Sequence, residues 1–170
     1  MENRRIILGM TGASGAILGI RLLEALQRAD IETHLVMSEW AEKTVAMETE
    51  YTAEDVKALA SVVHTPGDMA ACISSGSFPT DGMVVCPCSM KTLAAIASGF
   101  SYNLIARCAD VSLKEGRRLI LIPRETPLSA IHLENLLKLS RLGVKILPPC
   151  VGFYTKPKTI EDVVNHLTGK

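Results

Sequence analysis

The stretch from residue 6 to residue 15 reads Ile-Ile-Leu-Gly-Met-Thr-Gly-Ala-Ser-Gly. Its short apolar first half predicts a buried strand over residues 6–10, and the glycines of its second half predict a tight turn. Residues 16–28 then carry isoleucines and leucines at helical spacing, which predicts a helix. A strand, a glycine turn and a helix in this order form the repeating unit of a parallel sheet that helices cover on both faces.

The rest of the chain repeats this alternation of short apolar runs and longer amphipathic segments. Further strands are predicted over residues 32–37, 82–86, 118–123 and 144–147. We therefore expect a single α/β domain over residues 1–170, with any ligand bound at the edge where the carboxyl ends of the strands meet.

Prolines and small polar residues predict where several elements begin and end. Pro87 is expected to stop the strand before it, with a helix opening near Ser89. Thr126 is expected to cap a helix that has Pro127 at its first position. The last helix is expected to open at Thr159.

Composition and charge exclude several classes of partner. Apolar residues make up 48% of the chain, so we expect either apolar surface between subunits or an unusually apolar core. Eighteen basic and eighteen acidic residues cancel, and no basic stripe predicts binding to a nucleic acid. No apolar run approaches the roughly 18 residues of a membrane span. We expect a soluble, cytoplasmic protein.

The five cysteines are scattered, and only Cys86 and Cys88 lie close together in the sequence. No second pair supplies the other half of a zinc site, and no ligand cluster for Mg²⁺ is visible. We therefore expect reduced, mostly buried thiols and no metal.

The glycine turn predicts a phosphate site for a mononucleotide. Its glycines are spaced G-x-x-G-x-x-G rather than the G-x-G-x-x-G of dinucleotide sites, and the helix after it offers free N–H groups to a phosphate. The second strand ends at Ser38, without a carboxylate for a ribose hydroxyl. The alternative is that Ser14 only caps the helix.

Two further segments carry candidate groups. Residues 86–92 place small polar residues after a proline at a strand end, which predicts either a second pocket wall or an ordinary loop. Arg107 has apolar neighbours and suits either a phosphate or an ion pair. Lys114 follows two helical turns later and is either a ligand or a surface lysine.

The fourth strand is followed directly by Arg124 and Glu125. At such a strand end Glu125 is a candidate acid or base, and Arg124 would keep its carboxylate ionised. The alternative is a pair of opposite charges on the surface. Glu48 and Glu50 lie near the end of another predicted helix, where at least one of them is expected to face solvent.

Five strings, in the same order, resemble the UbiX/Pad flavin prenyltransferases, a family with members first described as aromatic-acid or phenylacrylic-acid decarboxylases. The resemblance covers essentially the whole chain and implies a flavodoxin-like Rossmann domain that assembles as a homododecamer with sites between subunits. The strings are Gly-Met-Thr-Gly-Ala-Ser-Gly-Ala (9–16), Pro-Cys-Ser-Met-Lys-Thr (87–92), Pro-Arg-Glu-Thr-Pro-Leu-Ser (123–129), Ile-His-Leu-Glu-Asn (131–135) and Pro-Pro-(x)4-Tyr (148–154).

The resemblance implies that the chain joins dimethylallyl monophosphate to reduced FMN at N5 and C6, and that a partner UbiD-type decarboxylase uses the prenylated FMN. It also assigns roles to individual residues. The residues implied to contact FMN are Gly12, Ala13, Ser14, Ser38, Cys88, Ser89, Met90, Lys91 and Arg107. Those implied to hold the prenyl phosphate are Lys114, Arg124, Tyr154 and Lys170, and those implied to transfer protons are Ser14, Glu48 and Glu125.

One position departs from the family pattern. Relatives usually carry an arginine sixteen residues after the tyrosine and then continue, whereas Lys170 stands there as the last residue given. Lysine supplies charge to a phosphate but not a bidentate fork. Trp40, the only tryptophan, is a candidate wall for the allyl cation.

Two other functions remain open on the sequence. An FMN-dependent cysteine decarboxylase of similar fold would need a catalytic histidine and a Pro-Ala-Ser-Ala-Asn-type loop. Here that loop reads Pro-Cys-Ser-Met at residues 87–90, and neither His64 nor His132 stands in a catalytic setting. The second alternative is a flavin-binding accessory subunit without activity of its own.

Overall fold

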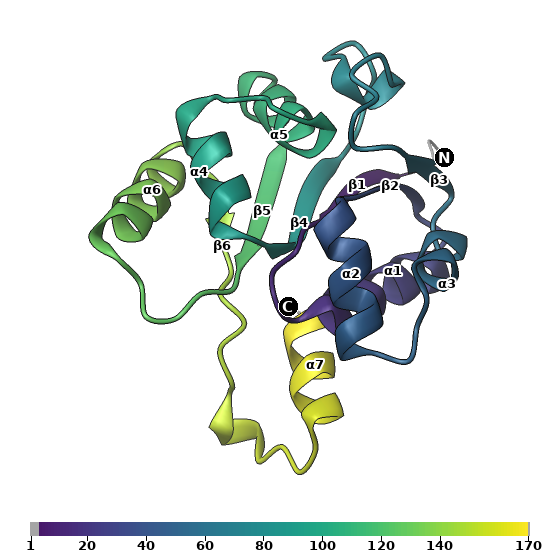
Figure 1. Cartoon of the computed structure of the whole chain (residues 1–170), viewed down its shortest axis with the longest axis vertical. Helices are drawn as coiled ribbons and strands as arrows, with labels where there is room; N and C mark the ends of the chain where they lie inside the picture. Colours follow the sequence, from purple (N-terminus) through teal and green to yellow (C-terminus); the bar gives the residue numbers. More distant parts are fainter. Residues whose placement is uncertain (1–3, 170) are drawn as a thin grey trace.

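A sheet of six parallel strands forms the centre of the computed structural model, which describes residues 4–169 (Figure 1). The strand order is β3-β2-β1-β4-β5-β6, so the chain winds outward from β1 in both directions. The strands are β1 (Arg5–Met10), β2 (Glu32–Met37), β3 (Val62–His64), β4 (Gly82–Cys88), β5 (Arg118–Pro123) and β6 (Lys145–Ile146).

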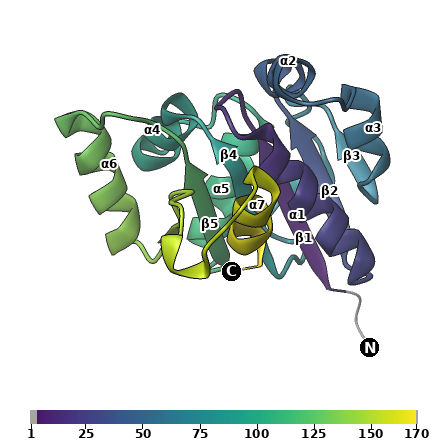
Figure 2. The same cartoon turned by 90° about the horizontal axis from the view of Figure 1, so that it is seen from below.

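Helices cover both faces of this sheet, as the sequence predicts (Figure 2). One face packs against α1 (Ala16–Arg28), α2 (Glu39–Glu48), α3 (Ala53–Ala58) and α7 (Ile160–Thr168). The other face packs against α4 (Met90–Ser98), α5 (Leu104–Lys114), α6 (Ala130–Arg141) and the 3₁₀ turn η1 (Cys72–Ser74). A second 3₁₀ turn, η2 (Phe153–Thr155), lies in the segment before α7.

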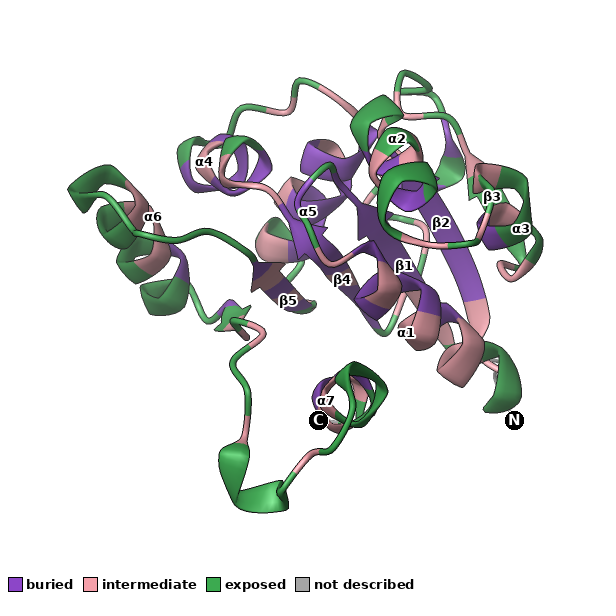
Figure 3. Ribbon diagram, turned by 60° about the horizontal axis from the view of Figure 1, so that its bottom comes forward, coloured by how far each residue is buried: buried purple, intermediate pink, exposed green. Residues whose placement is uncertain are grey.

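The central strands are buried on both faces, which explains their continuous apolar runs (Figure 3). Successive side chains of a strand point to opposite faces, so Ile7 lies in the core beneath α5 and Leu8 in the core beneath α1. The fold class expected from the sequence is therefore confirmed. No helix among residues 4–169 is long and apolar enough to span a membrane.

Two expected boundaries are wrong. Strand β4 does not stop at Pro87 but continues to Cys88, because the ladder with β5 shifts register between Val85 and Cys88 and so passes over the proline. Helix α6 does not start at Pro127. It starts after Ser129, whose hydroxyl accepts the N–H of His132 while the His132 ring accepts the N–H of Ser129.

Other boundaries agree more closely with the sequence. Ser89 caps α4 and Thr159 caps α7, both as expected. Strand β6 is shorter than the predicted run and covers Lys145–Ile146 only. The sequence analysis missed α3 and the edge strand β3, because both are too short to show a clear periodicity.

The close packing of α1 on β4 requires glycine at position 19. A methyl group there would lie 2.5 Å from the carbonyl oxygen of Cys86 and 2.7 Å from Cε of Met10. Alanine stabilises a helix interior by about 1 kcal/mol relative to glycine, but overpacking a core costs about 1–3 kcal/mol and here presses on backbone.

We therefore expect Gly19→Ala to lower the free energy of unfolding despite the better helix former. Urea denaturation measures this difference. Gly67→Ala is the matched control, since its methyl group would meet nothing within 4 Å, and it should change stability little. A Gly19→Ala variant as stable as the parent chain would contradict the packing described.

Candidate functional site

A buried hydroxyl joins the carboxyl ends of the two central strands. The Thr11 side chain directly after β1 donates to the Pro87 carbonyl at 2.8 Å and accepts the N–H of Ser89 at 2.8 Å. On the other side of β1, the N–H of Ser38 donates to the Met10 carbonyl at 3.0 Å. These bonds set the glycine turn and the first residues of α2 and α4 against one another.

An open cleft of about 520 Å³ lies at this edge of the sheet. Its size falls within the range typical of small-molecule sites, roughly 300–1,000 Å³. The residues that line it are Thr11, Gly12, Ser38, Glu39, Trp40, Pro66, Ser89, Lys91, Thr92, Tyr102 and Asn103. It therefore brings together four residues predicted to contact a flavin, namely Gly12, Ser38, Ser89 and Lys91.

Three helices have an N-cap residue that lines this cleft: α2 at Ser38, α4 at Ser89 and α5 at Asn103. Ser38 caps α2 and Ser89 caps α4 through side-chain hydrogen bonds to backbone N–H groups. Helix N-termini carry partial positive charge and attract anions. Gly12 is required on the opposite wall, because a Cβ at this position would overlap the Cβ of Trp40.

Aromatic rings give the cleft surfaces on which a planar ligand can stack. The Trp40 side chain is 63% exposed, and Tyr102 lies on another wall with the Lys91 ammonium 4.8 Å from its ring centre. Thr92 hydrogen-bonds the Tyr102 hydroxyl at 3.2 Å and so holds the ring in place. The cleft thus combines flat apolar surfaces with cationic and N–H groups.

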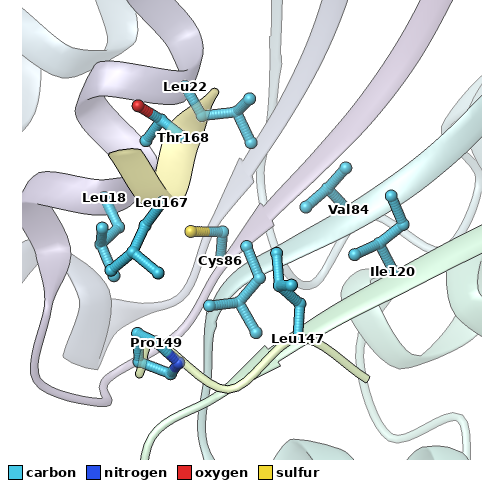
Figure 4. Close-up of a pocket in the computed structure, with 10 residues that line it drawn as sticks. Leu18, Leu22, Val84, Cys86, Ile120, Leu147, Pro149, Leu167 and Thr168 are labelled. Carbon is cyan, nitrogen blue, oxygen red and sulfur yellow. The ribbon is translucent and has the colours of Figure 1, made fainter. Parts of the chain in front are cut away.

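A second, smaller pocket of about 90 Å³ has a different character (Figure 4). It lies between α1, α7 and the strands β4 and β5, and its walls are almost entirely apolar. Burial raises the pKa of the Cys86 thiol, which faces this pocket, to about 12. The pocket therefore offers no reactive group, and the open cleft is the candidate functional site.

Glu48 stands beside the cleft at the start of α1, where the sequence analysis expected a phosphate. Its Oε2 accepts the N–H groups of Gly15 at 2.9 Å and Ala16 at 3.0 Å. The first N–H groups of α1 are therefore not free, as the sequence analysis expected, but bound to a carboxylate, and a phosphate at the glycine turn stays a prediction. Gly15 is the N-cap of α1, so the capping role considered for Ser14 is also wrong.

Glu48 is held in its ionised form by its neighbours. Burial acts to raise the pKa of Glu48, but hydrogen bonds from Ser14, Gly15 and Ala16 outweigh it and lower the pKa below its usual value. The positive charge of Arg124 lowers the pKa of Glu48 further.

Glu125 is not a partner of Arg124. Its carboxylate accepts the N–H of the next residue, Thr126, at 3.0 Å, and no ion pair joins it to Arg124 within residues 4–169. Glu125 is exposed in the loop between β5 and α6. The surface-pair alternative is therefore wrong, and the carboxylate is free to act on a molecule bound against this loop.

Comparisons with known proteins agree with this geometry. The family model described as Flavoprotein matches residues 1–170. A probable UbiX-like flavin prenyltransferase of Escherichia coli O157:H7 is 58% identical over 167 residues, which cover 98% of this chain and 85% of that protein. This chain belongs to the UbiX-like flavin prenyltransferase family.

Two solved structures extend the family likeness to three dimensions. The complex of AnUbiX (PadA1) with FMN and dimethylallyl pyrophosphate is 58% identical, with a TM-score of 0.98 over 99% of this chain and 89% of that one. The dodecameric FMN-dependent UbiX-like decarboxylase of Escherichia coli O157:H7 is 59% identical, with a TM-score of 0.95 over 96% of this chain and 89% of that one.

Within this UbiX-like chain, Arg107 lies one helical turn beyond Asn103, which caps α5 and lines the cleft. Its guanidinium donates to the Ser74 carbonyl at 3.1 Å and to Asp110 at 3.0 Å. The ion-pair alternative is therefore present in the structure, and contact with FMN stays a prediction.

The residues predicted to hold a prenyl phosphate are not all together in one UbiX-like chain. Lys114 is the last residue of α5. Because α5 runs antiparallel to the strands, Lys114 lies at the edge of the sheet opposite the cleft, where its ammonium pairs with Glu115 at 2.6 Å. Tyr154 lies on η2, 75% exposed, with its hydroxyl 3.2 Å from Nε2 of His166 (Figure 1). Lys170 lies outside the described residues.

Three residues predicted to contact FMN carry no exposed reactive group. Ala13 and Cys88 are buried, and burial raises the pKa of the Cys88 thiol. Met90 packs its side chain against the core beneath α4.

The sequence analysis did not single out six residues of the cleft: Thr11, Glu39, Pro66, Thr92, Tyr102 and Asn103. Asn103 could have been found, since an asparagine before an apolar helical run is a capping signal. Thr11, Pro66 and Tyr102 carry no such signal, because chain folding alone brings them to the cleft.

The lowered pKa of Glu48 predicts how it contributes to stability. A carboxyl whose pKa is lowered by folding stabilises the protein above its ordinary pKa of 4.5, and this stabilisation is lost as the pH falls through the folded-state value. Replacing a negatively charged side chain at a helix N-terminus by a neutral one typically lowers the free energy of unfolding by about 0.3–1 kcal/mol.

We expect Glu48→Gln to melt at a lower temperature than the parent chain near pH 7, and the difference to shrink below about pH 4.5. Thermal unfolding across this pH range measures both effects. Glu50→Gln, an exposed glutamate two residues away, is the control and should show no such pH-dependent difference. A Glu48→Gln difference that stays constant with pH would contradict the assigned cap.

Proposed function

We propose that this chain is a flavin prenyltransferase that joins dimethylallyl monophosphate to reduced FMN at N5 and C6, closing a fourth ring. The observation that carries the proposal is the cleft at the carboxyl edge of the sheet, in a chain whose fold matches that of a relative holding FMN and dimethylallyl pyrophosphate. The cleft has the flat walls and N–H groups that a flavin mononucleotide requires.

FMN would be held by residues on three sides of the cleft. The N-termini of α2 and α4 favour the anionic parts of the cofactor through Ser38 and Ser89, and Lys91 adds a positive charge. Trp40 and Tyr102 offer flat surfaces to the ring system. The remaining proposed contacts are Gly12, Ala13, Ser14, Cys88, Met90 and Arg107.

Ser14 and Glu48 form a proton-transfer pair in this proposal. Ser14 hydrogen-bonds a carboxylate that its surroundings keep ionised, so Glu48 can accept a proton that reaches it through the hydroxyl. Glu125 stands apart, exposed at the end of β5, and suits the base that removes the C6 proton during ring closure.

The departing phosphate needs several cations, because a monophosphate is a poor leaving group. Arg124, which directly follows β5 at the carboxyl edge of the sheet and whose charge lowers the pKa of Glu48, would supply one of them. Lys114 lies at the end of α5 that is distant from the cleft of its own chain. It would therefore contribute to the cleft of another copy of the chain. Tyr154 and Lys170 are also retained as proposed ligands of the phosphate.

Assembly would complete such a divided site. Several large apolar side chains are exposed, among them Ile131 at 68% on α6, a helix that is largely exposed (Figure 3). Clusters of exposed apolar side chains often mark sites of protein–protein contact. We propose that copies of this chain form a homododecamer, the assembly state of the relative from Escherichia coli O157:H7.

The product would serve a partner enzyme. We propose that prenylated FMN passes to a prenyl-FMN-dependent decarboxylase of the UbiD type, which acts on aromatic acids. The cytoplasmic location expected from the sequence stays a prediction.

The cysteine-decarboxylase alternative finds no support at the cleft. Neither His64 nor His132 lines it: His64 hydrogen-bonds His34, and His132 caps α6. An assay of the purified protein for prenylated flavin distinguishes an active enzyme from an accessory subunit.

Pure protein incubated with reduced FMN and dimethylallyl monophosphate should yield a flavin whose mass has increased by one dimethylallyl group. Mass spectrometry of the released flavin measures this. Glu125→Gln should still bind FMN but stall before the four-ring product, whereas Glu134→Gln, an exposed glutamate on α6, should behave as the parent chain. Unmodified flavin from the parent chain would favour the accessory subunit.

Light scattering should show a particle larger than a dimer at micromolar concentration. Ile131→Glu places a charge on the apolar face of α6 and should shift the population towards smaller species. Gln27→Glu, an exposed polar residue on α1, serves as control and should leave the mass unchanged. A stable monomer of the parent chain would exclude a site shared between copies.

A further inference from the structure

Two histidines and a cysteine meet behind the cleft, on the edge of the sheet that β2 and β3 form. His34 comes from the middle of β2, His64 ends β3, and Cys72 begins η1. Their ligand atoms, one from each side chain, all lie within 4.8 Å of one another. None of the three lines the cleft or takes part in the proposed reaction.

The buried member of the cluster is oriented by a carboxylate. His34 is 3% exposed, and its Nε2 lies 2.9 Å from Oε1 of Glu32. The Arg5 guanidinium donates two hydrogen bonds, of 2.8 and 3.0 Å, to the same carboxylate. A carboxylate oxygen can only accept from an imidazole nitrogen that carries a proton, so with Nε2 donating to Glu32, Nδ1 of His34 presents a lone pair.

That lone pair faces the second histidine. Nδ1 of His34 lies 2.9 Å from Nε2 of His64, and the two ring planes differ by only 13°. The rings therefore meet edge to edge, with their nitrogens pointing at each other. Neutral imidazole is the form of histidine that binds metals.

We propose that His34 Nδ1, His64 Nε2 and Cys72 Sγ bind one Zn²⁺ ion, with Glu32 orienting His34 from behind. Imidazole nitrogen and thiolate sulfur are the ligands that zinc prefers. A carboxylate behind a ligating histidine is the usual supporting partner in such sites.

The cluster needs only small movements to reach zinc geometry. Zn–N bonds of about 2.0–2.1 Å and a Zn–S bond of about 2.3 Å, arranged tetrahedrally, place the two nitrogens about 3.4 Å apart and each nitrogen about 3.6 Å from the sulfur. The nitrogens must therefore separate slightly from 2.9 Å, and the exposed Cys72 side chain must turn inward. Water takes the fourth position on the exposed side.

Proton balance is simple at such a site. His64 moves its proton from Nε2 to Nδ1 without a change of charge, and His34 keeps its proton on the side of Glu32. The Cys72 thiol loses its proton to solvent as the thiolate binds. Binding therefore releases one proton for each zinc ion.

The consequence would be structural rather than catalytic. Zinc would tie His64 to Cys72 and so close the loop 65–71, which carries Pro66 of the cleft wall. The Pro66 carbonyl accepts the N–H of Leu104 at the start of α5, and the residue after Cys72, Ile73, accepts a hydrogen bond from Cys108. The metal would thus fix a segment that backs both the cleft and α5.

Zinc content tests the proposal directly. The full chain is reduced, stripped with a chelator, loaded with micromolar Zn²⁺, passed over a gel-filtration column and analysed by mass spectrometry of the metal. We expect one zinc per chain, a gain in melting temperature, and loss of both in Cys72→Ser and His64→Gln. Cys150→Ser, which removes an exposed cysteine outside the cluster, should keep both.

Thiol protection gives a second readout that does not depend on folding of a ligand variant. In the Cys150→Ser chain, Cys72 is the one exposed thiol, because Cys86, Cys88 and Cys108 are buried. Zinc should slow alkylation of Cys72 at least tenfold, and Co²⁺ should give the absorption of a cobalt thiolate. Zinc that binds equally to Cys72→Ser, or alkylation that zinc leaves unchanged, would overturn the proposal.

Discussion

The hydroxyl of Thr11 is the junction on which the functional edge of this protein depends. It is buried where β1 and β4 end. It donates a hydrogen bond to the Pro87 carbonyl and accepts one from the Ser89 N–H. A buried hydroxyl without partners is costly, so the arrangement that satisfies it is strongly favoured over alternatives. The glycine turn, the cap of α4 and the cleft between them all take their positions from this junction.

Charge is distributed around that junction by local groups rather than by a net field. The N-termini of α2 and α4 face the cleft, while the N-terminus of α1 is neutralised by Glu48. The N-terminus of α1 thus binds the carboxylate of Glu48, which also hydrogen-bonds Ser14. The N-termini of α2 and α4 remain available to an anion. This division separates the candidate proton-transfer group from the candidate cofactor surfaces in a protein whose net charge is zero.

The same sheet carries a second polar cluster on its outer edge. The chain of contacts from Arg5 through Glu32 and His34 to His64 runs along the edge that β2 and β3 form, and it ends beside the loop that lines the cleft. Its members are far apart in the sequence, so their spacing shows no metal-binding pattern. The cluster connects the packing of an edge strand to the wall of the functional site.

Local sequence determined the strand at residues 6–10 and the helix at residues 16–28, because periodicity and glycine turns are short-range signals. It failed where a longer-range contact decided the outcome. The register shift with β5 carried β4 past Pro87, and the folding of α2 brought Glu48 onto the first N–H groups of α1. Tertiary structure alone decided which charged groups meet, because that choice depends on elements that pack together from distant parts of the chain.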